Sequence, residues 1–341
     1  MSWGMSYIGV HSDDLGLCSN DEESERVISG LTEIFANDVA GSVKVQRGNE
    51  LMWLGIKIKR DRELKEMYLS QKEYIEVILQ KFSNMMNIPV TDIPFATAPA
   101  PRTLFDYNDD TKSTEMNIRL LSLTMSFMFL ASRTRPDLLT VVSYLSSRAF
   151  HHCPKDDKIL IQLMGYTIAT IDKVLTLSST NLEMYAFTDS SSNNNTIDGT
   201  SQFAMLISLG YDHPTGRSTG FVIASSNKGH DVCLSSTEAE IVAQANCLKF
   251  VLWLKKLLEC LGFPDQKNIT VFQDNEAAIS MAIQGKGNFR NTKHIQTRYF
   301  FMHQHVKNNN IRLLFQETEM MIADIFTKPL HGWLLRKLTA I

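Results

Sequence analysis

The chain has 341 residues, of which 44% are hydrophobic and 21% charged, and its net charge is −3. This length allows two or three domains, and the weak charge excludes a uniformly basic surface, so any nucleic-acid binding must come from local patches. The five cysteines form no CxxC pair and no apolar run reaches the roughly 20 residues of a membrane span, which favours an intracellular protein without a zinc site or a disulfide framework.

In chain order, the first feature is "YIGVHSDDLGL", residues 7–17, where apolar residues flank the adjacent Asp13 and Asp14. The pattern predicts a hairpin of two short strands joined at the acidic pair. A solvated turn explains the two aspartates, and half of a metal site is the alternative, because carboxylate oxygens bind Mg²⁺. Only "MSWGMS" precedes this hairpin, and a hairpin needs sheet neighbours, so we expect a truncation at the N-terminus.

Apolar periodicity predicts the elements that follow. They are a helix over 20–37 with Asn20 or Ser19 as its N-cap, strands over 51–61 and 65–71, and a helix over 71–82. Four of the nine prolines lie in 84–117, which we interpret as an extended connector without a core of its own.

Two helices are expected next, over 118–150 and 155–171. The loop between them carries His151 and His152, for which a loop pair is favoured over a metal site. From residue 181 the pattern predicts the order β-β-β-α-β-α-α-β-α, a mixed α/β domain of about 160 residues. Its long helix is expected to be capped by Ser236 or Thr237 and ended by Gly262, and "MIADIFTKPL" to begin a closing helix.

Four acids occupy informative positions in this last domain. Asp189 and Asp274 come at the ends of apolar strands, Glu240 lies in the first turns of the long helix, and Asp324 begins the last one. Strand ends and helix starts are where sites gather in α/β folds. Each acid also has a local explanation, as a helix cap or as a first-turn charge that interacts with the helix dipole, so spacing alone leaves the alternatives open.

A family resemblance favours the site. The blocks "FTDSS", "STEAEIVA", "VFQDNEAAI", "NTKHIQTRYF" and "IADIFTKPL" resemble, in their order and spacing, the ribonuclease H region of copia-type LTR retrotransposon polyproteins. "HSDDLGL" resembles the "YVDD" hairpin of their reverse transcriptase, "WLGIKIKRD" the end of the palm, and "YLSSRAFHHCP" the connecting region. The resemblance covers essentially the whole chain.

The resemblance implies an RNase H fold that cuts the RNA strand of RNA–DNA hybrids at two Mg²⁺ ions, with Mn²⁺ as an alternative. By their place in the blocks, the catalytic and metal-binding residues are expected to be Asp189, Glu240, Asp274 and Asp324. Glu238 is then a capping or outer residue. Such a site needs several carboxylates, because they hold both cations beside the scissile phosphate.

Substrate binding has a local signal of its own. From Lys286 to Arg312 there are six Lys and Arg, three His and no acid, a stretch that could line a nucleic-acid backbone. The expected nucleic-acid-binding residues are Lys286, Arg290, Lys293, His294 and Arg298. For His294 a structural role is equally open.

Asp13 and Asp14 resemble the paired aspartates of a polymerase site. The third aspartate of that site lies upstream of the matching region, and His11 stands where the family has tyrosine, so we expect a relic metal site and no polymerase activity from this chain alone. The expected domains are a palm remnant and thumb entry (1–83), a Pro-rich connector (84–117), a helical connection (118–180) and an RNase H-like domain (181–341).

The expected partners are an RNA–DNA hybrid and the upstream reverse transcriptase and integrase parts of the same polyprotein, without a membrane. The expected location is cytoplasmic, in a virus-like particle, or nuclear. Two alternatives to a nuclease remain: a degenerate, inactive retrotransposon fragment, and a nucleic-acid-binding module that has the RNase H fold but does not cleave.

Overall fold

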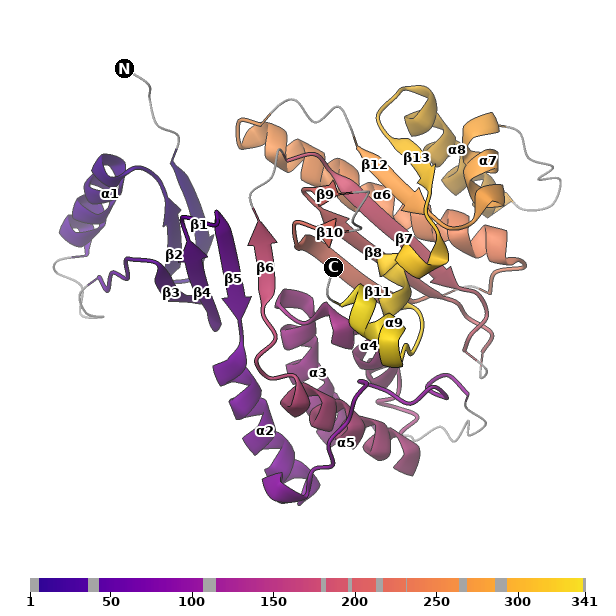
Figure 1. The fold of residues 1–341 in the computed structure, drawn as a ribbon, viewed down its shortest axis with the longest axis horizontal. Helices are drawn as coiled ribbons and strands as arrows, with labels where there is room; N and C mark the ends of the chain where they lie inside the picture. Colours follow the sequence, from indigo (N-terminus) through magenta and orange to yellow (C-terminus); the bar gives the residue numbers. More distant parts are fainter. Residues whose placement is uncertain are drawn as a thin grey trace.

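In the described residues, a four-stranded and a five-stranded β-sheet are accompanied by helices and by two short two-stranded pairs (Figure 1). The structure is a computed structural model that describes residues 6–35, 43–106, 115–178, 182–195, 198–212, 217–230, 232–263, 269–285 and 293–339, with only the backbone of 217 and 293–296. Throughout these ranges, every helix is too short or too polar to cross a membrane.

The N-terminal region forms the predicted hairpin and a four-stranded antiparallel sheet. The hairpin pairs β1 (Tyr7–His11) with β2 (Asp14–Cys18). The sheet has the order β3-β4-β5-β6, with strands at Glu50–Trp53, Ile56–Asp61, Glu66–Ser70 and Leu175–Ser178. The expected strand over 51–61 is therefore two strands, because Leu54 and Gly55 adopt positive φ angles of 50° and 73° and turn the chain.

Five helices accompany this region. They are α1 (Asp21–Ile34), α2 (Lys72–Met86), α3 (Ile118–Arg133), α4 (Leu139–Ser147) and α5 (Pro154–Ala169), with short 3₁₀ turns η1 (Val90–Asp92) and η2 (Pro136–Leu138). The single helix expected over 118–150 is wrong, because the chain breaks before Pro136. Proline lacks an N–H group and disfavours helical geometry in the residue before it, and Arg135 has φ −128° and ψ 65°.

The connector also differs from the expectation that it lacks any core. Its described part has no strand, but Ala98, Ala100 and Leu104 are buried with residues of α2 to α5. The side chains of a Pro-rich segment can pack while its backbone stays irregular, which the proline count does not reveal.

The C-terminal region contains a mixed five-stranded sheet of order β11-β8-β7-β12-β13. Its strands are β7 (Tyr185–Ser191), β8 (Gln202–Ser208), β11 (Phe221–Lys228), β12 (Thr270–Gln273) and β13 (Arg312–Phe315), with the short pair β9 (Tyr211–Asp212) and β10 (Arg217–Ser218) beside them. The first three are antiparallel, and β12 pairs in parallel with β7 and β13. The predicted mixed α/β class with a mixed five-stranded sheet is confirmed.

The helices of this region are α6 (Ser236–Cys260), α7 (Glu276–Gln284), α8 (Lys293–Lys307) and α9 (Gly332–Leu338). The N-cap of α6 is Ser235, whose hydroxyl accepts from the Glu238 N–H, one residue earlier than expected. Gly262 follows the last turn with φ 88°, a left-handed conformation that glycine adopts without a steric penalty.

Side chains alternate across the five-stranded sheet and so divide the core in two. Ala186, Met205 and Val271 face one side, where they pack against α6. Phe187 and Phe272 face the other, where they join a core that includes α3, α4 and α5. Because successive residues of a strand point to opposite faces, one sheet contributes to both cores. The helical connection therefore shares one of these two cores, the one that contains Phe187 and Phe272, with the C-terminal sheet.

Candidate metal centre

Two strand ends bring the first two acids together. Asp189 lies near the end of β7, and Asp274 directly follows β12. The two strands are parallel neighbours, so their carboxyl ends reach the same edge of the sheet. Asp189 is buried and faces the same side as its cross-strand partner Ala204, whereas Asp274 is half-buried.

The third acid comes from a short 3₁₀ helix. Asp324 lies in η4 (Ile322–Phe326), whose apolar residues are all part of the core that includes α3 to α5. The closing helix expected from residue 321 is wrong in this respect: η4 ends at Phe326, Pro329 follows, and α9 begins only at Gly332. The packing of η4 nevertheless buries Asp324 at the sheet.

These three residues form a compact cluster. Asp189, Asp274 and Asp324 each offer a carboxylate oxygen, and the three oxygens lie within 4.8 Å of one another. Carboxylates gathered at this spacing suit a hard divalent cation.

Glu240 adjoins the cluster from α6 and is buried. Its Oε1 accepts from the backbone N–H of Ser190 at 3.3 Å, and its Oε2 accepts from Nε2 of Gln273 at 2.9 Å. Ser190 follows Asp189, and Gln273 precedes Asp274. These two bonds orient Glu240 toward the same edge of the sheet, outside the group of three oxygens.

Burial and mutual repulsion change the acidity of the cluster. Burial, followed by the negative charge of Asp189, raises the pKa of Glu240 to about 8 and that of Asp324 to about 7. The same two causes raise the pKa of Asp274. Negative charge gathered in a buried place is unfavourable without a counter-ion, which a bound cation would supply.

One lysine already provides part of that positive charge. Nζ of Lys328 lies 2.8 Å from Oδ1 of Asp324 and 3.5 Å from Oδ2 of Asp189. Burial alone would lower the pKa of Lys328, but the charges of Asp189 and Asp324 outweigh it and raise that pKa. Lys328 was not among the residues predicted from the sequence, although its position four residues after Asp324 was the available signal.

Two hydroxyl groups orient the aspartates. Thr327 Oγ1 donates to Oδ2 of Asp189, and Thr318 Oγ1 donates to Oδ2 of Asp274 at 3.2 Å. Among the residues that the structure describes here, four carboxylates adjoin the ammonium group of Lys328, so the residues present fit a divalent cation.

The structure places only some of the other residues singled out in the sequence. Asp13 and Asp14 sit exposed at the tip of the β1–β2 hairpin. The predicted role of the basic stretch stays untested: Lys286 and Arg290 lie outside the described residues, and Lys293 and His294 are in α8 with undescribed side chains. Arg298 is half-exposed on α8.

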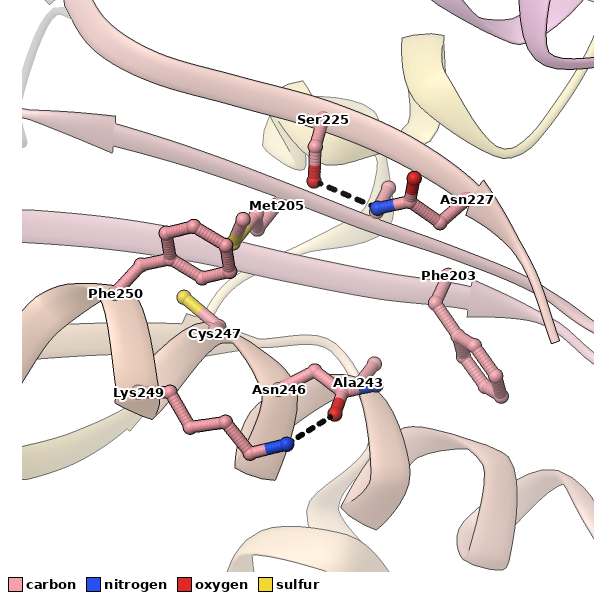
Figure 2. Close-up of a pocket in the computed structure, with 10 residues that line it drawn as sticks. Phe203, Met205, Ser225, Asn227, Ala243, Asn246, Cys247, Lys249 and Phe250 are labelled. Carbon is pink, nitrogen blue, oxygen red and sulfur yellow. Dashed lines mark hydrogen bonds between the residues drawn. The ribbon is translucent and has the colours of Figure 1, made fainter. Parts of the chain in front are cut away.

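A small cavity of about 140 Å³ lies apart from the acids. Figure 2 shows Phe203 and Met205 of β8 facing Cys247 and Phe250 of α6 across it. Met205 belongs to the α6 side of the sheet, whereas Asp189 faces the opposite side. Its lining contains no carboxylate, so this cavity is not part of the candidate metal centre.

Comparisons with known proteins agree with the resemblance in the sequence. No family model matches the chain. It is 27% identical over 94% of its length to the retrovirus-related Pol polyprotein from transposon TNT 1-94 of Nicotiana tabacum, covering 23% of that protein. It is 29% identical over 95% of its length to that from transposon RE2 of Arabidopsis thaliana, covering 21%. The chain thus spans about a fifth of the curated relatives it matches.

Solved structures are more distant in sequence. A foamy viral protease-reverse transcriptase in complex with an RNA/DNA hybrid has 13% identity and a TM-score of 0.49, with coverage of 91% of this chain and 36% of that one. LC11-RNase H1 in complex with an RNA/DNA hybrid has 17% identity and a TM-score of 0.29, with coverage of 42% and 93%.

Proposed function

We propose that this chain corresponds to the part of copia-type retrotransposon Pol polyproteins that covers the end of the reverse transcriptase and the RNase H-like domain. We further propose that it cleaves the RNA strand of RNA–DNA hybrids. The observation that carries this proposal is the convergence of Asp189, Asp274 and Asp324 within 4.8 Å at one edge of the five-stranded sheet. Glu240, which hydrogen-bonds to the Ser190 N–H and to Gln273 beside two of these aspartates, is our proposed fourth acid.

The three aspartates and Glu240 are the residues that would hold two Mg²⁺ ions, with Mn²⁺ as an alternative. When bound, such ions activate a water molecule and stabilise the oxygen that leaves the phosphate. The contribution of the chain is to orient the carboxylates, through Thr327 at Asp189 and through Gln273 at Glu240. Lys328 balances part of the negative charge while the metal is absent, and a phosphate of the substrate could bind it afterwards.

The hybrid is expected to lie against α8, where Arg298 and the neighbouring basic residues would contact phosphates. The exposed pair Asp13 and Asp14 has no assigned role in cleavage, and we regard it as the relic of a polymerase site. The upstream parts of the same polyprotein would be the natural protein partners.

A strand-specific nuclease assay tests the proposal. The purified chain is incubated with a hybrid whose RNA and DNA strands carry different labels, with Mg²⁺ or with a chelator. We expect cleavage of RNA alone, dependent on Mg²⁺, and lost in Asp189→Asn because a neutral amide is a poor bridge between cations.

Two results would reject cleavage and favour an alternative. Binding of the hybrid without cleavage by the folded wild type would indicate a nucleic-acid-binding module. Neither binding nor cleavage would indicate a degenerate fragment.

A further inference from the structure

The short helix η4, which carries Asp324, is held between two other parts of the molecule. On one side lies the C-terminal sheet, through β7 and β8, and on the other the helical connection, through η2 and α4. Ile325 and Phe326 are buried in the core that both parts share. Asp324 therefore depends on a segment that lies almost 180 residues earlier in the chain.

Two buried hydroxyl groups donate hydrogen bonds to the backbone carbonyls of the two residues that follow Asp324. Oγ1 of Thr140, on α4, donates to the carbonyl of Ile325 at 2.6 Å. Oγ of Ser226, on β11, donates to the carbonyl of Phe326. Both side chains are 5% exposed, so water offers those carbonyls little alternative.

A buried glutamine connects the two sides. Nε2 of Gln202, on β8, donates to Oγ of Ser226 at 2.8 Å and to Oγ of Ser143 at 3.0 Å. Ser143 lies on α4, less than one turn after Thr140. The network thus joins the helical connection, the sheet and η4 through hydrogen bonds that end on residues other than the four acids.

A helix of five residues needs such support. Few internal hydrogen bonds fix η4, among them those from Asp324 N to Met321 O at 3.1 Å and from Thr327 N to Asp324 O at 3.3 Å. Thr327, which donates to Asp189, follows this same helix. A shift of η4 would therefore displace one candidate metal ligand and loosen another.

We propose that Thr140 and Ser226 are positioning residues of the metal centre, and that the helical connection helps to position this centre through Thr140. This inference rests on the proposed function insofar as it assigns Asp324 to a metal ion. Residues that orient metal ligands without touching the metal commonly change metal affinity by about 10-fold to 100-fold when altered.

The test is a Mg²⁺ titration of the full chain in two readouts, the rise in melting temperature and the rate of hybrid cleavage. Thr140→Val keeps the shape of the side chain but loses the hydroxyl. In this variant we expect the Mg²⁺ concentration that gives a half-maximal response to increase about 10-fold, both for the melting temperature and for the cleavage rate. Thr140→Ser restores the donor and should restore the wild-type value.

Thr167→Val is the matched control. Thr167 is also buried, and its hydroxyl donates within its own helix α5, to the carbonyl of Leu163. This variant should lose some stability while the half-maximal Mg²⁺ concentration stays unchanged. If Thr140→Val fails to fold, Ser226→Ala provides the same measurement from the other side of η4.

An unchanged Mg²⁺ requirement in folded Thr140→Val or Ser226→Ala would overturn the inference, and so would a wild type that does not bind Mg²⁺. The two proposals fail separately. If the wild type cleaves no hybrid but Mg²⁺ still raises its melting temperature, and more weakly in Thr140→Val, the nuclease proposal falls and the positioning role stands.

Discussion

Two acidic sites of this chain contrast in how they are built. In the β1–β2 hairpin, Asp13 and Asp14 are adjacent in the sequence, exposed at a turn, and supported by a two-stranded ladder. In the C-terminal sheet, Asp189, Asp274 and Asp324 are far apart in the sequence and come together through strand order and packing.

The contrast shows that the acids of a candidate metal centre need not be adjacent in the sequence. Exposed carboxylates are screened by water and gain little from a cation, whereas buried ones repel each other and shift in pKa. In the described residues, hydroxyl and ammonium groups orient the second group: Thr327 at Asp189, Thr318 at Asp274 and Lys328 at Asp324.

The largest expected effect separates the two sites by activity. We expect Asp324→Asn to lower the rate of hybrid cleavage about a thousandfold, since a metal ion contributes several kcal/mol to such a reaction. The double variant Asp13→Asn, Asp14→Asn should cleave at the wild-type rate. Initial rates with the labelled hybrid measure both. If the cleavage rate fell equally in Asp324→Asn and in the double variant, the proposed difference between the two sites would be wrong.

A smaller effect concerns stability without metal. The pKa values of Glu240 and Asp324 are raised to about 8 and about 7, above the values of an unfolded chain. From about pH 5 to pH 8 the folded state therefore binds more protons than the unfolded state, so the free energy of unfolding falls as pH rises.

Neutralising one acid should weaken that pH dependence. In chelator at pH 8, we expect Asp274→Asn to raise the melting temperature by about 2 to 4 °C, which corresponds to roughly 1 kcal/mol for a domain of this size. The gain should shrink toward pH 5. The hairpin control Asp14→Asn should show no change at either pH. A melting temperature lowered at pH 8 in Asp274→Asn would contradict the repulsion described for the cluster.

The smallest expected effect concerns the basic stretch. If Lys293 and Arg298 each contact a phosphate, changing both to alanine should reduce the log–log salt slope of hybrid binding by about 1.4 to 1.8, or roughly 0.7 to 0.9 per contact. Arg26→Ala, at an exposed position on α1, is the control and should leave the slope unchanged. An unchanged slope in a folded double variant would move the binding surface away from α8.

Much of the C-terminal region was predictable because its signals are local. Short continuous apolar runs marked β7 and β8, and the run that follows Ser235 marked α6. The positions of the four acids followed from the family blocks, since no spacing rule places Asp189 beside Asp324.

The parts that sequence reasoning missed depend on distant contacts. β6 pairs with β5, with Leu175 opposite Leu69, and no local sequence pattern predicts that β5 is the partner of β6. The role of Lys328 depends on the fold of η4. The sequence instead predicted that a closing helix begins at residue 321. Non-local packing decided both.

Direct measurement of metal binding tests the central claim most closely. Calorimetric titration with Mg²⁺ is made on the wild type, on Asp189→Asn, and on the double variant Asp13→Asn, Asp14→Asn. We predict saturable binding by the wild type and by the hairpin variant, and its loss in Asp189→Asn. Absence of binding in the wild type, or binding that survives in folded Asp189→Asn but disappears in the hairpin variant, would contradict the account.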